Sequence, residues 1–442
     1  MKRFAELAGG REAVFVCTPD FAGRLVGKKR AAGEWASLSS EGMAMPDFHL
    51  VTNIENRPQE GLAAAGATQG FGNGRLVADE SAAFLSPLLP GAVHVIADPV
   101  RTDGTRCPEA PREVLRRQLA RLAELGLSAR FASELEFYAF RQNHAEADAR
   151  GYRDLSPIYH RHGDNDVLVT GVLSPFLDEI EANLTACGIS VEQVQTEGGP
   201  GQIEINVGPR APLEAADEHV AFKHVVKATA HRAGLAATFL AKPFAQEAGS
   251  GGHVHLSLQD AAGRNALGLS PDELTGPGRA FLAGLVRFTP DFTLLHAPYA
   301  NSYRRLVPGA YTPLVSSWGV DNRTAMVRLV CGGSGVRLEM RLPGADANPY
   351  LCYAGIIAAG LAGIEAGLST GAPKQGGADA PDAPALPGDL TEALHGWENS
   401  SAAIAAFPDP VHAHVAGHGR LELLATRRAV TDWEVARGFE NA

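Results

Sequence analysis

Cysteines are few in this sequence and long apolar segments are missing, which excludes several classes of protein. The five cysteines are an odd number, lie far apart and show no zinc-type spacing. We therefore expect free thiols in a cytoplasmic protein, because disulfides persist in oxidising compartments. No apolar run reaches the ~18 residues of a membrane-spanning helix, so no membrane partner is expected. The first six residues already include an acid and precede no apolar run, unlike a secretory signal.

Long basic runs are also missing, and the net charge of the chain is negative. Its 442 residues are 20% charged and 45% hydrophobic, with a formal net charge of −11. Such a chain has no extended basic surface to attract nucleic acid, so no nucleic-acid partner is expected. The composition is that of a globular protein with enough length for two domains.

The first part of the chain has the pattern of a small β-rich domain. Residues 1–105 alternate short apolar runs with turns rich in Gly and Pro. Strands are predicted at 14–16 and 92–96, where apolar β-branched residues cluster. We therefore place a first domain at residues 1–105.

The rest of the chain, residues 106–442, combines helical patterns with strands. One helix is predicted from Pro111 to a stop at Gly126, and another from Ser174 to a stop at Gly188. Strands with alternating polar and apolar residues lie between and after these helices. The pattern predicts an α+β fold in which helices pack against a curved, largely antiparallel sheet.

Four of these strands carry acidic, basic or imidazole side chains on one face and apolar side chains on the other. They cover residues 133–137, 202–206, 253–258 and 337–341. Residues two apart on a strand share a face, so Glu134 lies beside Glu136 and His253 beside His255. Gathering like charges on one surface opposes folding unless a polyvalent cation and a polyanion bind there.

Six side chains are the candidate metal ligands: Glu134, Glu136, Glu197, Glu204, His253 and Glu339. A set dominated by carboxylate oxygens suits Mg²⁺ or Mn²⁺ better than zinc, and its size fits two or more ions. Two such ions could bridge the phosphates of a nucleotide during phosphoryl transfer. The alternative is that these are surface carboxylates that alternate by chance.

Several longer motifs complete the pattern. They are residues 197–206, 242–244, 301–309, 322–323 and 348–350, together with 134–136, 253–257 and 337–341. On these motifs the chain resembles glutamine synthetase, the ATP-dependent glutamate–ammonia ligase, most strongly from residue 131 to 350. The resemblance implies a glutamine synthetase fold, with a small β-grasp-like N-terminal domain and a large catalytic domain at 106–442. It also implies a homo-oligomer, a hexameric ring or a dodecamer of two stacked rings, with each active site between neighbours.

The resemblance also implies a role for each matching residue. One metal ion would be held by Glu136, Glu197 and Glu204, and a second by Glu134, His253 and Glu339. ATP would be bound through His255, Ser257, Arg323 and Arg328, and Arg328 would contact the transferring phosphoryl group. Glutamate would be bound by Arg305, Arg341 and the backbone of Gly249. The catalytic candidates are Arg323, Arg328 and, in the flap, Tyr311.

Three departures from glutamine synthetases concern the nitrogen nucleophile and glutamate. In those enzymes a flap Glu helps to bind ammonium and takes its proton, whereas this flap has Tyr311. Tyrosine has a reference pKa of ~10 and no charge, so it attracts ammonium poorly and is a weak base. The N-terminal motif that supplies a second ammonium-binding Asp is missing around residues 39–43. Ala248 replaces the usual Asn before Gly249, close to the amino group of glutamate.

These departures favour an amine over ammonium as the nucleophile. The closing segment 430–434 also resembles relatives that make γ-glutamylpolyamines, γ-glutamylmethylamide and γ-glutamylanilide. We therefore predict an ATP-dependent ligase that joins the γ-carboxyl of L-glutamate to an amine through γ-glutamyl phosphate. The alternatives are a glutamine synthetase in which Tyr311 merely packs the flap, a non-catalytic nucleotide-binding regulator, and a metal hydrolase built on His253 and His255.

Overall fold

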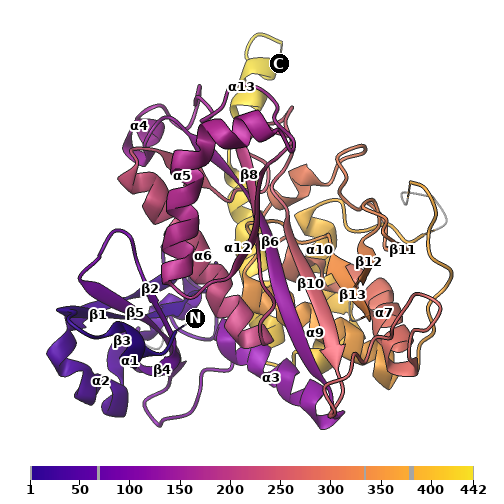
Figure 1. The fold of residues 1–442 in the computed structure, drawn as a ribbon, viewed down its shortest axis with the longest axis horizontal. Coiled ribbons are helices and arrows are strands. Elements are labelled where there is room, and N and C mark those ends of the chain that lie inside the picture. The colour runs from indigo at the N-terminus through magenta and orange to yellow at the C-terminus, as the bar shows by residue number, and fades with distance from the viewer. Residues whose placement is uncertain (1, 67–69, 333–334, 378–382, 442) are drawn as a thin grey trace.

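Figure 1 shows a computed structural model of the chain, in which a small N-terminal sheet lies beside a larger sheet of long, curved strands. The structure describes residues 2–66, 70–332, 335–377 and 383–441. Helices pack around the larger sheet, and the C-terminal helix projects at the end of the molecule away from the small sheet. Within the described ranges, no helix is both long and apolar enough to cross a membrane.

The N-terminal part forms a five-stranded sheet with short helices. Its elements are α1 (Phe4–Leu7), β1 (Ala13–Pro19), β2 (Leu25–Ala31), α2 (Trp35–Glu41), β3 (Met43–Pro46), β4 (Asn73–Leu85) and β5 (Ala92–Val100). The strand order is β2-β1-β5-β4-β3, with β1 and β5 parallel and the other pairs antiparallel. Val14, Val93 and Val95 are buried between this sheet and its helices. These β-branched residues explain why the predicted strands form at 14–16 and 92–96.

The larger sheet carries the four polar strands predicted from the sequence. Its strands are β6 (Ser128–Phe140), β7 (Val191–Thr196), β8 (Gln202–Val207), β9 (Ala236–Thr238), β10 (Gly252–Gln259), β11 (Trp318–Val320), β12 (Val327–Gly332) and β13 (Gly335–Met340). The order is β11-β12-β13-β10-β6-β8-β7, and β9 also pairs with β6. Every pair except β11–β12 is antiparallel, which confirms the predicted α+β class and the largely antiparallel, curved sheet.

Helices cover the apolar face of the larger sheet and so leave its polar face free for a site. The helices of this part of the chain are α3 (Pro111–Glu124), α4 (His144–Ala149), α5 (Val167–Ala186), α6 (Pro212–Arg232), α7 (Gly276–Phe288), α8 (Thr293–His296), α9 (Pro349–Glu365), α10 (Leu390–Asn399), α11 (Ser401–Ala406), α12 (Val411–Arg428) and α13 (Asp432–Gly438). α9 is buried along almost its whole length and packs against α3, α6 and α7. Leu135, Leu256 and Leu338 point from the sheet into this core. Burying these apolar residues fixes the register that aligns the polar residues on the other face.

The two predicted helices are both present, but one begins earlier than expected. α3 begins at Pro111 and ends before Gly126, whose φ of +69° suits the chain reversal there. The helix predicted from Ser174 begins instead at Val167, because the Asp166 carboxylate accepts hydrogen bonds from two free N–H groups of the first turn. Pro175 lies inside this helix, on an exposed side, rather than at its start.

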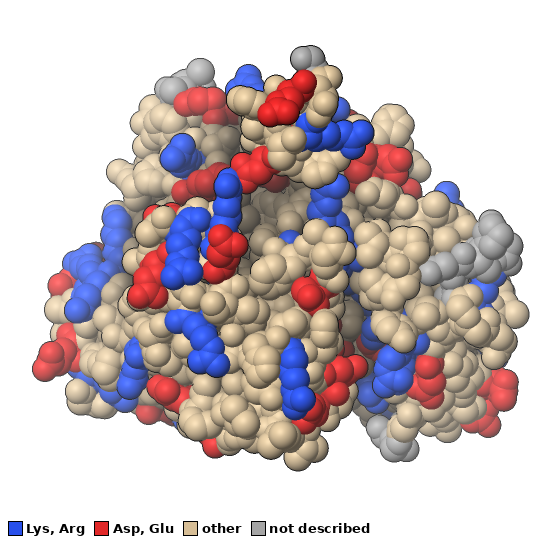
Figure 2. Space-filling view, turned by 90° about the horizontal axis from the view of Figure 1, so that it is seen from above, with Lys and Arg blue, Asp and Glu red and all other residues tan. Residues whose placement is uncertain are grey.

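Charged side chains of both signs are interspersed on the face of the molecule in Figure 2. Basic side chains are scattered over this face, with acidic ones beside many of them, rather than gathered into one stripe. The attraction of this face for a ligand therefore depends on local clusters of side chains, not on a long-range field of one sign.

Candidate active site

Pairing between strands brings the predicted acidic and imidazole residues into one row across the larger sheet. Glu136 on β6 lies directly opposite Glu204 on β8. Glu134, two residues before, lies opposite His253 on β10. Side chains that face each other across neighbouring strands are close enough to interact. The alternation read from the sequence therefore produces a contiguous group of ligand atoms from three strands.

The row continues over the other half of the sheet. His255 on β10 lies opposite Glu339 on β13, and Glu339 lies opposite Arg328 on β12. Arg328 donates a hydrogen bond from Nη1 to Glu339 over 3.0 Å and from Nη2 to Asp321 over 3.1 Å. One end of the row is thus acidic and the other end contains cations, which suits a bound metal next to a bound phosphate.

The acidic end of the row holds more negative charge than the surrounding protein neutralises. Glu136 accepts hydrogen bonds from Gln202 Nε2 at 3.0 Å and from the backbone N–H of Gly251 at 2.9 Å. Burial, and then the charges of the neighbouring glutamates, raise the pKa of Glu204 to about 10. Burial and the charge of Glu136 also raise the pKa of Glu197. These carboxylates need either protons or a polyvalent cation to lie so close together.

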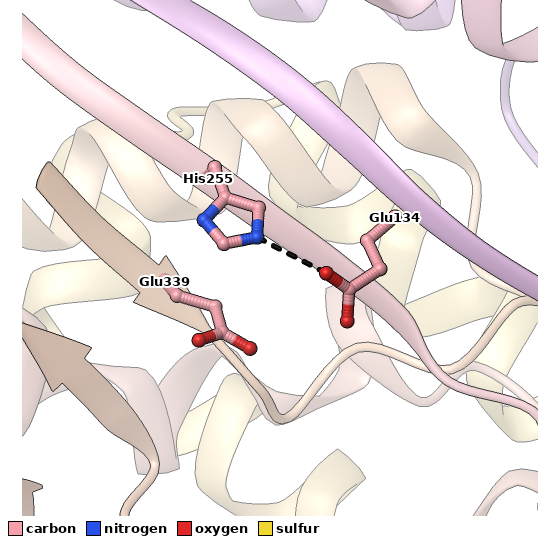
Figure 3. A group of neighbouring side chains, drawn as sticks. All are labelled: Glu134, His255 and Glu339. Atoms are coloured by element: carbon pink, nitrogen blue, oxygen red, sulfur yellow. Dashed lines mark hydrogen bonds and ion pairs between the residues drawn. The ribbon is translucent and has the colours of Figure 1, made fainter. Parts of the chain in front are cut away.

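A second group of ligand atoms surrounds Glu134. Figure 3 shows Glu134, His255 and Glu339 pointing toward one another, with one ligand atom of each within 4.8 Å of the others. His253 also borders this group, with Nδ1 2.7 Å from Glu134 and 3.8 Å from Glu339. Burial would raise the pKa of Glu134, but hydrogen bonds from the two imidazoles outweigh it and hold the pKa well below its usual range. Glu134 is therefore an anionic ligand at neutral pH.

The two histidines differ in what they can offer to a ligand. Arg337 Nε lies 3.3 Å from His255 Nδ1, and an arginine N–H can only donate, so Nδ1 accepts this hydrogen bond. His255 Nε2 therefore carries the ring proton, which it donates to Glu134 over 3.3 Å. An N–H group suits an anion such as phosphate, whereas His253 Nδ1 faces two carboxylates as a metal ligand would.

Two buried arginines, Arg305 and Arg341, border the row. Arg305 donates from Nη2 to the carbonyl of Leu342, and its buried Nε has no hydrogen-bond partner among the described residues. Arg341 contacts Glu339 through Nη1 and donates from Nε to the carbonyl of Arg323 over 2.9 Å. A buried guanidinium N–H without a partner is costly, and a carboxylate ligand would satisfy it.

Gly249 allows the chain to pass directly beside Arg305. A Cβ atom at this position would lie 2.8 Å from the carbonyl oxygen of Ala241 and against the side chain of Arg305. The carbonyl of Gly249 accepts a hydrogen bond from Gln202 Nε2 over 3.0 Å. Gln202 thereby joins this backbone to Glu136, so the acidic cluster and the arginine pair form one continuous site.

The far end of β10 leads to a separate cavity of about 230 Å³. Ser257, Asn265 and Arg337 are among the residues that line it. Arg323 is exposed, and its backbone rather than its side chain contacts Arg341. Because Arg337 also contacts His255, the cavity adjoins the His255 end of the row. Ser257, which is predicted to contact ATP, lies in its wall.

The flap that follows Arg305 holds Tyr311 in an unusual conformation. Tyr311 has a φ of +52°, which non-glycine residues rarely adopt, and 71% of its surface is exposed. The neighbouring Thr312 fixes the base of the flap by donating from its hydroxyl to the carbonyl of Arg305 over 3.0 Å. The Tyr311 ring is therefore exposed on a loop whose base is hydrogen-bonded to the backbone of Arg305.

Three contributing residues were not among those predicted: Gln202, Asn206 and Arg337. Asn206 Nδ2 donates to Glu134 over 3.2 Å, while Gln202 and Arg337 contact Glu136 and His255 as described above. The signal was available, because residues 202, 204 and 206 alternate on one face of β8. Gln202 and Asn206 are neutral amides that orient the ionised ligands, so they do not stand out among the charged residues of the sequence.

Comparison with known proteins places this chain among a defined set of relatives. The family profile described as "Glutamine synthetase, catalytic domain" matches residues 108–438. The γ-glutamylethanolamide synthetase GlnA4 of Streptomyces coelicolor is 39% identical, over 98% of this chain and 94% of that protein. The glutamate–isopropylamine ligase of a Pseudomonas species is 34% identical, over 90% of this chain and 88% of that protein. The solved structure of a GmaS–ADP complex superposes with a TM-score of 0.86 at 29% identity and covers all of both chains.

Proposed function

Because this chain belongs to the glutamine synthetase family and is a ligase, we propose that it uses ATP to join the γ-carboxyl of L-glutamate to an amine. The observation that carries the proposal is Tyr311 in the flap, where glutamine synthetases have an acid. The names of the two relatives compared above, which make an ethanolamide and an isopropylamide of glutamate, agree with it.

We propose that Mg²⁺ or Mn²⁺ ions bind along the row of carboxylates. Glu136, Glu197 and Glu204 would hold one ion, and their crowding, which raises the pKa of Glu204, supports a polyvalent cation there. Glu134, His253 and Glu339 would hold another, supported by the short contacts of His253 Nδ1. When bound, such ions neutralise the charge of the nucleotide phosphates.

The proposed ATP site lies at the cationic end of the row. His255 would donate its Nε2 proton to a phosphate oxygen in place of Glu134, and Arg337 fixes the tautomer that makes this possible. Arg328 and Arg323 would stabilise the phosphoryl group in transfer, since both come from the segment beside Glu339. Ser257 would lie near the adenosine, in the cavity at the end of β10.

The proposed glutamate site consists of Arg305, Arg341 and the backbone of Gly249. The unpartnered Nε of Arg305 would bind a carboxylate of glutamate and hold it in place. The γ-carboxylate oxygen then attacks the γ-phosphorus of ATP, and ADP leaves, giving γ-glutamyl phosphate. The amine nitrogen attacks the γ-carbonyl carbon, phosphate leaves with the bond electrons, and the nitrogen loses a proton to form the amide.

Tyr311 would select the nucleophile. Its ring offers an apolar contact to the carbon chain of an amine and no negative charge to ammonium. As for the glutamine synthetases that the sequence resembles, we propose a homo-oligomer, as a hexameric ring or a dodecamer, and a cytoplasmic location in keeping with the free cysteines.

A glutamine synthetase is the second candidate, and one observation favours it. Tyr311 is largely exposed, as expected if this residue only forms part of the flap and another residue binds ammonium.

Phosphate release from Mg-ATP and L-glutamate tests the proposal, with ammonium in one series and amines in the other. The amines are methylamine, isopropylamine, ethanolamine, putrescine, spermidine and aniline. We expect an amine to support turnover at far lower concentration than ammonium. Efficient turnover with ammonium alone would establish the second candidate, and no phosphate release with any nucleophile would remove both.

A further inference from the structure

A second large cavity lies outside the proposed active site, between α6 and the hairpin of β1 and β2. Its volume is about 510 Å³, within the ~300–1,000 Å³ range of small-molecule sites. Lys223 and Lys227 of α6 line one side, Phe239 lies beside them, and Arg24 comes from the hairpin. None of the residues proposed to bind metal, ATP or glutamate lines this cavity.

The two lysines converge on one aromatic ring. Lys223 Nζ lies 5.4 Å and Lys227 Nζ 5.8 Å from the centre of the Phe239 ring. Burial, and then the charge of Lys227, lower the pKa of Lys223 to about 7. The pKa of Lys227 is lowered too, first by the protein atoms packed around it and then by the charge of Arg24, while part of the side chain is exposed to solvent. Such a convergence of cations opposes folding, and a bound anion would relieve the repulsion.

The neighbouring charges do not neutralise the lysines equally. Arg24 already donates to Asp20, from Nε over 2.9 Å and from Nη2 over 2.6 Å. Lys223 Nζ donates to the carbonyl of Ala345 over 2.7 Å. For Lys227 the described part of the chain offers a ring contact but no hydrogen bond or ion pair, so its ammonium group is free to bind a ligand.

Two acids, Asp346 and Glu422, also line the cavity, and the charge of Asp346 partly offsets that of Lys223. Burial raises the pKa of Asp346, which accepts a hydrogen bond from the Ser302 hydroxyl over 2.6 Å. Burial, and then the charge of Glu55, raise the pKa of Glu422. Lys227 is therefore the lysine of this cavity whose ammonium group has no hydrogen bond or ion pair among the described residues, and it lies next to Lys223.

Apolar side chains make up much of the remaining wall, including Leu25, Val220 and Leu240. A ligand that matches this lining has an anionic head and an apolar body. We propose that the cavity binds a small organic carboxylate, with its head between the ammonium groups of Lys223 and Lys227 and its body against Phe239 and the apolar wall.

A ligand bound in this cavity would affect the proposed glutamate site through a short chain of hydrogen bonds and packing contacts. Lys223 holds the carbonyl of Ala345, and the N–H of Ala345 donates to the carbonyl of Ser250 over 3.1 Å. Ser250 follows Gly249, which lies beside Arg305. A carboxylate that draws Lys223 away from Ala345 would loosen this loop and change the KM for glutamate, a consequence that rests on the proposed function.

Isothermal titration of the full chain without ATP tests the binding itself. The probes are hexanoate, benzoate and inorganic phosphate, with hexanamide as the uncharged match of hexanoate. We expect a carboxylate to bind, hexanamide not to bind, and Lys227→Met to weaken carboxylate binding at least tenfold. Lys29→Met, which removes an exposed lysine of β2 outside the cavity, is the matched control and should leave binding unchanged. No binding of either carboxylate, equal affinity in Lys227→Met, or binding of phosphate alone would overturn the site.

Steady-state kinetics tests the link to glutamate. The carboxylate that binds should change the KM for glutamate in the wild type and not in Lys227→Met. An unchanged KM would overturn the link while the binding result stands. If the chain proves to have no ligase activity, the proposed function fails, and the titration still decides whether the cavity binds a carboxylate.

Discussion

At the scale of single residues, the chemistry of the site depends on which acids share one face of the sheet and on which ring nitrogen of His255 carries the proton. Glu134, Glu136 and Glu204 could be predicted to share one face because strands alternate, and the register between strands then sets them opposite one another. The tautomer of His255 could not be predicted, because it depends on Arg337 from a strand 82 positions away. Long-range contacts of this kind carry no local sequence signal.

Glu204→Gln separates the binding role of this residue from its effect on stability. A carboxyl group whose pKa in the folded state is raised from 4.5 to about 10 lowers the stability of the metal-free protein as pH rises between those values. Glutamine removes this penalty, so the metal-free variant should be more stable at pH ~8 by roughly 1 kcal/mol or more.

Thermal unfolding in EDTA at several pH values measures this effect, and the variant should lose stability less steeply with pH than the wild type. Ligase activity of the same variant should fall by about 100-fold or more, because a metal ligand is lost. A variant with normal turnover would contradict the metal assignment. A variant that is less stable without metal would contradict the charge argument.

Tyr311→Glu should shift the enzyme toward ammonium. The new carboxylate restores a negative charge and a base at the flap, so the kcat/KM ratio of ammonium to ethanolamine should rise by about tenfold or more. Tyr311→Phe is the matched control, since it keeps the ring and adds no charge. Identical ratios in the wild type and the glutamate variant would contradict a selecting role for the flap.

At the scale of elements, strands and helices were predictable where the apolar period was regular. α3 follows its pattern from Pro111 to Gly126, whereas α5 begins seven positions before the predicted Ser174, at Val167. The proline at 175 suggested a first turn, but the Asp166 cap starts the helix earlier and Pro175 is tolerated on its exposed side. Competing start signals within one segment cannot be ranked from sequence alone.

Gly249→Ala tests the close packing of the Gly249 backbone against the Arg305 side chain. The added methyl group meets Ala241 and Arg305, so Arg305 must move and the KM for glutamate should rise by about tenfold or more. Gly171→Ala, in α5 with open space around it, is the control and should leave KM unchanged. Steady-state kinetics at saturating ATP measures both, and an unchanged KM in Gly249→Ala would argue against this glutamate site.

At the scale of the whole molecule, a buried ion cluster joins the N-terminal sheet to the helices of the larger part. Arg112 of α3 donates to Asp98 of β5 over 2.6 Å and to Asp79 of β4 over 2.9 Å. It also donates to Asp217 of α6, over 2.9 Å and 2.8 Å. This cluster could not be predicted, because its members are up to 138 residues apart in the sequence and each resembles an ordinary surface charge.

Arg112→Met should destabilise the protein by about 3–5 kcal/mol, because buried Asp217 loses its cationic partner and keeps only the hydrogen bond from the Tyr350 hydroxyl. Chemical denaturation, followed by the fluorescence of the tryptophans, measures the change. Arg117→Met, on the exposed side of α3, is the control and should change stability by less than about 0.5 kcal/mol. Equal stability of the two variants would contradict the proposed role of this cluster.

The most direct test of the central claim is a competition between nucleophiles. Purified protein with Mg-ATP and L-glutamate is given ammonium, ethanolamine and isopropylamine at equal concentrations, and the products are quantified by mass spectrometry. We predict that a γ-glutamylamide of an amine exceeds glutamine. A product pool of glutamine, with the amines untouched, would contradict it.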